Sequence, residues 1–120
     1  MITFNQSMIQ KDVVDPLFSE WDILSIQIHD AHSARNGLAN ELMAKGIALY
    51  EKLIVITANQ TPTEIITNEE YEVLPINGME RLQFIKARPG QYACYRQLDE
   101  LFKETKKKLA RLRVKKELKK

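Results

Sequence analysis

Apolar residues recur at steps of three and four positions along most of the chain, a spacing that places side chains on one face of an α-helix. The pattern predicts four principal helices, at about 16–32, 38–58, 77–87 and 91–115. The connection between the second and third is long enough to hold extra turns. We therefore expect an all-α fold, a four-helix bundle-like single domain with a long basic C-terminal helix.

The first helix is predicted to begin at Asp15 and Pro16, because Asp caps helix N-termini and Pro is tolerated at the first helical position. The apolar stripe that follows is Leu17, Trp21, Leu24 and Ile28. Residues 1–15 are predicted to form an N-terminal arm. Its apolar positions suit either a short strand or an arm packed on the body: Ile2, Phe4 and Met8.

The second helix carries two neighbouring apolar stripes, which is typical of a central helix in a bundle. One stripe is Leu38, Leu42, Leu49, Leu53 and Ile56, and the other is Met43, Ile47, Tyr50 and Ile54. A strand over 53–57 is the local alternative, because β-branched residues favour strands. The helical stripe begins several turns earlier, so we predict a helix.

A short third helix is predicted to start at Asn77, which can cap it, with Glu80 placed to reach back toward the first turn. Its expected buried side is Leu82, Phe84 and Ile85. The segment Arg88–Gly90 should end it, because the residue before Pro89 avoids the helical region and Gly permits a sharp corner.

The last helix is predicted from about Gln91, on an apolar series at three- and four-residue steps. That series is Tyr92, Tyr95, Leu98, Leu101, Phe102, Leu109 and Leu112. We divide the chain into the arm, a helical domain at 16–102 and a basic C-terminal extension of the last helix at 103–120.

Charge is distributed very unevenly between these parts. Ten of the eighteen Lys and Arg residues lie in 103–120 against two glutamates, which gives that segment a net charge of +8. The first 102 residues hold eight Lys and Arg against fourteen Asp and Glu, a net charge of −6. An acidic body with a basic end indicates a polyanionic partner, or contact between one molecule's basic end and another's body.

The basic helix is the candidate nucleic-acid-binding element. Its candidate residues are Lys106, Lys107, Lys108, Arg111, Arg113, Lys115, Lys116, Lys119 and Lys120. Cations that surround a helix in this way follow a phosphate backbone and contact few bases, so binding should be nonspecific and salt-dependent. The alternatives are a solvated helix end that only improves solubility and, less favoured, attachment to a membrane surface.

Other chemistry-bearing residues give weaker signals. His29 and His32 lie one helical turn apart and could supply two metal ligands, but no third ligand follows at a fixed spacing. Cys94 lies among apolar neighbours and is predicted to be a buried thiol. The sequence contains no nucleotide-binding, hydrolase-elbow or CxxC motif. We therefore expect no cofactor, no assigned metal site and no enzymatic activity.

Targeting signals are weak as well. The first twelve residues lack a continuous hydrophobic block, and the longest aliphatic run is Leu53–Ile56, far short of the ~20 residues that span a bilayer. A single cysteine fits a reducing compartment. We expect a cytoplasmic protein with no membrane insertion. Homo-oligomer formation is possible.

One segment resembles a known protein family. The run Glu80–Tyr92, with sequence ERLQFIKARPGQY, and the continuation Tyr95–Phe102, with sequence YRQLDELF, are similar to the signature of the YpoC-like family. This family consists of small helical proteins from bacteria of the Bacillus and Staphylococcus type. The resemblance implies an all-helical bacterial protein and brings no established activity, cofactor or catalytic residue.

Two functional hypotheses follow. The first is an uncharacterised non-enzymatic accessory protein that binds nucleic acid or another polyanion, or an acidic protein, through its basic C-terminal helix. The second is a protein–protein interaction adaptor that uses the surface of the helical bundle. Binding that weakens steeply with salt would separate the first from the second.

Overall fold

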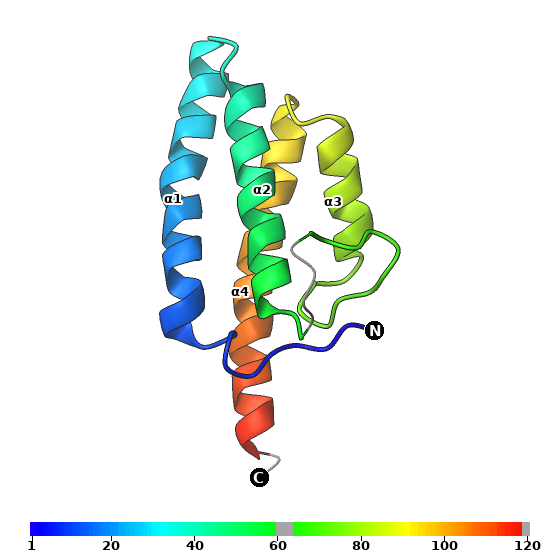
Figure 1. Ribbon diagram of the computed structural model, residues 1–120. Helices are drawn as coiled ribbons and strands as arrows, with labels where there is room; N and C mark the ends of the chain where they lie inside the picture. The colour runs from blue at the N-terminus through cyan, green and yellow to red at the C-terminus, as the bar shows by residue number, and fades with distance from the viewer. Residues whose placement is uncertain (60–63, 119–120) are drawn as a thin grey trace.

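The computed structural model describes residues 1–59 and 64–118, and this part of the chain forms four helices. They are α1 (Lys11–Ala34), α2 (Ala39–Thr57), α3 (Gly78–Ala87) and α4 (Tyr92–Leu118). Successive helices run in opposite directions, and α4 packs against the other three (Figure 1). The predicted all-α, four-helix bundle-like single domain is confirmed.

Helix α1 begins at Lys11, five residues before the start that the sequence pattern predicts. The N-cap residue is Gln10, so the predicted cap at Asp15 is wrong, and Pro16 lies inside the helix. The longer helix is favoured because it buries Val14, which is 1% exposed. Pro16 lacks an N–H and so gives up one backbone hydrogen bond within α1.

The first five residues form an extended arm along the lower end of the bundle, and a turn at residues 6–8 leads toward α1 (Figure 1). The Ile2 amide donates to the carbonyl oxygen of Glu70 at 2.7 Å, and the Asn59 amide donates to Thr3 at 2.7 Å. These contacts make isolated bridges rather than a strand within the described residues. The arm alternative is therefore the one that the structure adopts.

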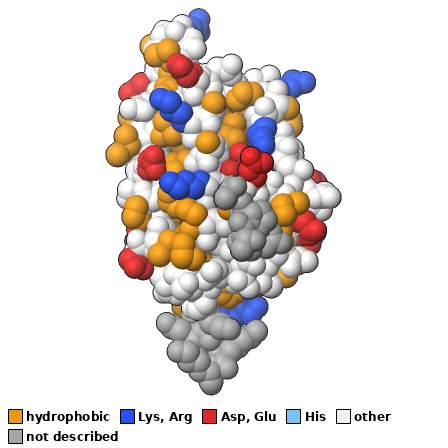
Figure 2. Space-filling view, viewed as in Figure 1, with side chains coloured by type: hydrophobic (Ala, Val, Ile, Leu, Met, Phe, Trp, Pro, Cys, Tyr) orange, Lys and Arg blue, Asp and Glu red, His pale blue; other side chains and the backbone are white. Residues whose placement is uncertain are grey.

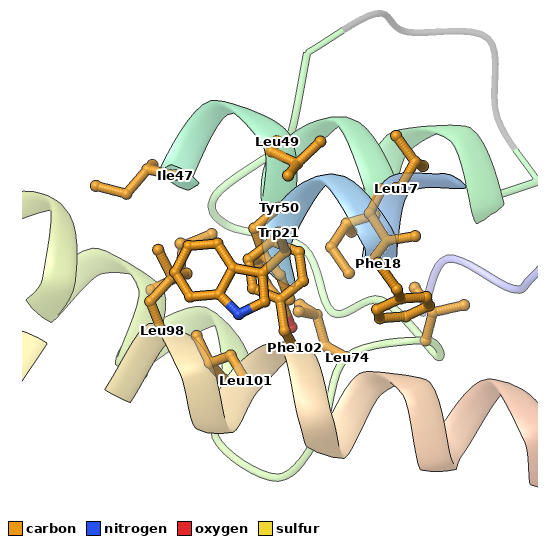
Figure 3. Close-up of a cluster of buried hydrophobic side chains, with 14 of the residues drawn as sticks. Leu17, Phe18, Trp21, Ile47, Leu49, Tyr50, Leu74, Leu98, Leu101 and Phe102 are labelled. Carbon is orange, nitrogen blue, oxygen red and sulfur yellow. The ribbon is translucent and has the colours of Figure 1, made fainter. Parts of the chain in front are cut away.

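The core is built around an aromatic ring on α4. Phe102, 1% exposed, stacks on Trp21 with 4.4 Å between ring centroids and an interplanar angle of 10°. Its edges meet Tyr50 at 5.0 Å and Phe18 at 6.3 Å in T-shaped contacts. Figure 3 shows these rings converging from three helices. Each such pair adds about 0.5–1.5 kcal/mol beyond the area that it buries.

Two further features complete this core. The Tyr50 hydroxyl and the Thr105 hydroxyl are 2.7 Å apart, which satisfies two buried polar groups between α2 and α4. The connection between α2 and α3 also buries apolar side chains that the sequence pattern does not reveal, namely Tyr71, Val73, Leu74 and Pro75. In the described part of the chain, no helix is long and apolar enough to cross a membrane.

Gly46 on α2 is packed closely against side chains of α1 and α4. A Cβ at this position would lie 2.8 Å from Cζ3 of Trp21 and 3.2 Å from a methyl group of Leu98. The indole ring is held by its stack on Phe102, so it cannot move aside freely. Only glycine fits this position without displacing the aromatic core.

We predict that Gly46→Ala destabilises the protein by roughly 1–3 kcal/mol, the usual cost of overpacking a core. Helix propensity alone predicts the opposite sign, because Ala is favoured over Gly by roughly 0.5–1 kcal/mol inside a helix. Urea unfolding of the wild type and the variant measures the difference. A stabilised variant would contradict the close contact with Trp21.

Candidate polyanion interface

Helix α4 carries the candidate cations from Lys106 to Lys116. Its inner face is buried along the length of the bundle, at Leu98, Leu101, Phe102, Thr105, Leu109 and Leu112. The helix continues without a break past the boundary that the sequence suggests at residue 102, and its end projects beyond the other helices (Figure 1). Burial of this face determines which of the cations point outward.

Three of the candidate cations form an exposed row. Lys107, Arg111 and Lys115 follow one another at four-residue steps, so they share one side of α4 at a rise of about 6 Å per step. Within the described residues, none of the three takes part in an ion pair. Their charges are therefore exposed to water along the second half of α4.

Two other candidate cations point inward and hold irregular segments of the chain. The Lys108 ammonium donates to the carbonyl oxygen of Leu74 at 2.7 Å, and the Arg113 guanidinium donates to that of Ile9 at 2.7 Å. Burial lowers the pKa of Lys108 because desolvation disfavours the charged form. The structure thus separates these two residues from the exposed row.

The remaining candidates differ in their surroundings. The Lys106 ammonium lies 5.6 Å from the centroid of the Phe18 ring, a cation–π distance, and the side chain is still exposed. The side chain of Lys116 lies outside the described part of the structure, as do Lys119 and Lys120. Lys103, outside the candidate set, pairs with Asp99 at 2.9 Å on the same helix.

A bidentate ion pair joins the first turn of α3 to the middle of α4. Arg81 donates to both carboxylate oxygens of Glu104, at 3.1 and 2.7 Å, and also to the carbonyl oxygen of Ile76 at 3.2 Å. The hydrogen bonds from Arg81 lower the pKa of Glu104, and the same contact raises the pKa of Arg81. The sequence reasoning assigned Arg81 no role, because a single arginine on a helix gives no signal of its partner.

Three expectations about α3 and the start of α4 are wrong. Asn77 makes no capping hydrogen bond with its side chain and adopts a left-handed backbone conformation, with φ of 53°. Phe84 is 55% exposed, because Leu82 and Ile85 turn the opposite side of α3 toward the core. Tyr92, the first residue of the apolar series predicted for the last helix, is also partly exposed.

The histidines and the cysteine lie near the start of α4. The His32 ring meets Tyr92 edge-on with 5.2 Å between centroids, and His29 Nδ1 lies 3.7 Å from an Asp30 carboxylate oxygen. Among the described residues, no three His, Cys, Asp or Glu side chains gather as a metal site would require. Cys94 is buried as predicted, and burial raises the pKa of its thiol, which disfavours the nucleophilic thiolate.

The surface of the bundle contrasts with the α4 row. Figure 2 shows cationic, anionic and hydrophobic side chains interspersed over the described part of the face formed by α1 and α2. A mixed surface of this kind produces little net field. The row of like charges on α4 differs from this face and has the character of an anion-binding surface.

The fold and this row define a small all-α bundle whose last helix presents cations to solvent. The family model for YpoC-like proteins matches residues 11–117. The chain belongs to the YpoC-like family. No solved structure matches it.

A relative in Bacillus subtilis (strain 168), the uncharacterized protein YpoC, is 32% identical over 96 residues. The match covers 76% of this chain and 58% of the relative. The chain thus spans little more than half of that protein's length. The similarity supports the family assignment.

We predict that Glu104→Gln lowers the free energy of unfolding by about 1 kcal/mol near neutral pH, a value that allows for solvent screening of a partly exposed pair. The pKa of Glu104 is lowered in the folded state, so the carboxylate stabilises the fold above its unfolded pKa and stops doing so as pH falls through its folded pKa. Urea unfolding of both proteins should show the difference shrinking below the ordinary glutamate pKa of 4.5. A difference that is independent of pH would contradict the ion pair.

Proposed function

We propose that this protein is a non-enzymatic accessory protein of the bacterial cytoplasm that contacts nucleic acid through the outward cations of α4. The observation that carries the proposal is the row of Lys107, Arg111 and Lys115, which is exposed and has no ion pair within the described chain. Successive charges of the row are about 6 Å apart along the axis of α4, so a phosphate backbone that runs along this helix can contact each of them. Lys116, Lys119 and Lys120 are further candidates for contact with phosphate groups.

The binding should depend little on base sequence. Lysine and arginine contacts to phosphate position a protein on nucleic acid and carry no direct sequence information. Their contribution arises largely from the release of counterions, which makes affinity fall as salt rises. The inward residues Lys108 and Arg113 should contribute little, because each is already engaged with a backbone carbonyl group.

The test compares two variants that each lose three charges. In the row variant, Lys107, Arg111 and Lys115 become Gln, and in the control the exposed Lys11, Lys45 and Lys52 become Gln. Binding to labelled DNA, measured by fluorescence anisotropy over a salt series, should weaken in the row variant, and its salt slope should fall by about 1 for each lost phosphate contact. Equal losses in the row variant and the control would reject the α4 row as the binding surface.

A protein-binding role is the second candidate, and one observation favours it. Ile23 and Ile26 are 64% and 63% exposed and lie three residues apart on α1. Large aliphatic side chains at this spacing can enter a groove on a partner protein. An adaptor would use this surface in place of the α4 row.

For the adaptor we predict that one protein is retained from a nuclease-treated bacterial lysate by the wild type and is lost with Ile23→Ser/Ile26→Ser. Both side chains are exposed, so the variant should keep its thermal stability. Capture that is unchanged in this variant would remove α1 as the binding surface.

A further inference from the structure

A shallow hollow at the seam between α3 and α4 lies apart from the cation row. Its volume is about 310 Å³, at the lower end of the range of about 300–1,000 Å³ that is usual for small-molecule sites. The hollow is lined by Asn77, Glu80, Arg81, Phe84 and Gln97. The lining therefore combines one aromatic ring with four polar side chains.

The aromatic ring comes from Phe84, which is 55% exposed. Leu82 and Ile85 are fully buried on the other side of α3, so the helix cannot turn Phe84 inward without exposing them. The ring is therefore held at the surface by the packing of its neighbours. An exposed ring is a surface on which a flat, apolar π-system can stack.

One of the polar groups around the ring, the Arg81 guanidinium, is fixed in orientation. The ion pair with Glu104 immobilises Arg81, whose Nε donates to Gln97 Oε1 at 3.4 Å. Because this oxygen faces Arg81, the amide nitrogen of Gln97 is left as a donor. The Asn77 carboxamide does not cap the helix, so its carbonyl oxygen can accept a hydrogen bond and its amide nitrogen can donate one.

We propose that this hollow binds one base of a single-stranded nucleic acid, with Phe84 stacking on the base and the carboxamides of Asn77 and Gln97 meeting its polar edge. The inference rests on the proposed nucleic-acid contact of α4. The Glu80 carboxylate fits the same reading, because it accepts from an exocyclic amino group of a base and repels a phosphate. A base, rather than the backbone, occupies the hollow.

The hollow and the cation row both border α4. Gln97 precedes Lys107 by ten residues, a distance of about 15 Å along the axis of α4. A single strand whose backbone lies on the cation row can therefore place a base a few nucleotides further along in the hollow. A duplex cannot do so without opening, because its bases are paired and stacked.

The experiment compares Phe84→Leu with Phe84→Tyr, which keeps the aromatic ring. Anisotropy is measured with a labelled single-stranded DNA of mixed sequence, about 12 nucleotides long, and with the matching duplex. Phe84→Leu should weaken single-strand binding about tenfold, the usual effect of losing one base–aromatic stack, and leave duplex binding unchanged. Phe84→Tyr should keep wild-type affinity for both. Far-UV circular dichroism and a thermal melt of each variant should match the wild type.

Two results would overturn the inference, and they are distinguishable. If Phe84→Leu binds the single strand as tightly as the wild type while the α4 row variant does not, the base site is rejected and the phosphate contact stands. If the wild type binds neither DNA, or if the row variant behaves as its control does, the proposed function fails and the base site fails with it.

Discussion

The packing of Phe102 is the constraint on which the rest of the structure depends. Its ring is enclosed by Trp21, Tyr50 and Phe18, from two other helices, and so fixes the rotation of α4 about its own axis. Successive residues of an α-helix are about 100° apart, so a shift of one residue would exchange the inward and outward positions. The aromatic core thereby determines which lysines meet water and which meet the protein.

The cations of α4 consequently serve two different physical purposes. Lys108 and Arg113 satisfy carbonyl groups of Leu74 and Ile9, in segments that lack regular backbone pairing. A charged donor strengthens such a hydrogen bond, and desolvation of the ammonium, which lowers the pKa of Lys108, opposes it. The net charge of a segment therefore overstates the charge that it offers to a partner.

The periodicity of apolar residues was sufficient to predict the four helices and most of the core. It failed where tertiary contacts override local signals, as at the start of α1, where burial of Val14 carries the helix back to Lys11. Asn77 has a common capping residue type, yet its backbone conformation and side chain do not serve that purpose. The capping preference of a residue type is therefore a weak guide at the end of a connection whose path is set by tertiary packing.

The candidate site was predictable only in part, for a related reason. The sequence shows how many cations lie along the last helix. It does not show that Lys107 faces water while Lys108 bonds to the carbonyl oxygen of Leu74, because this depends on where Leu74 lies in space. The hollow beside Phe84 was not predictable, because it joins α3 to a residue of α4 thirteen positions later. Helix α3 is short and has only two fully buried apolar side chains, Leu82 and Ile85. The tertiary fold therefore decides where its other side chains point.

The order of charges along α4 gives the two halves of this helix different chemistry. Glu100 and Glu104 lie on its first half, and Glu104 is already engaged by Arg81, so little positive charge is offered there. The described residues after Glu104 include no further acid until Glu117. A phosphate backbone is therefore attracted more strongly to the second half of α4 than to the first half, where opposite charges largely cancel. The α3–α4 seam is then suited to an uncharged part of the same ligand, which in a nucleic acid is the base.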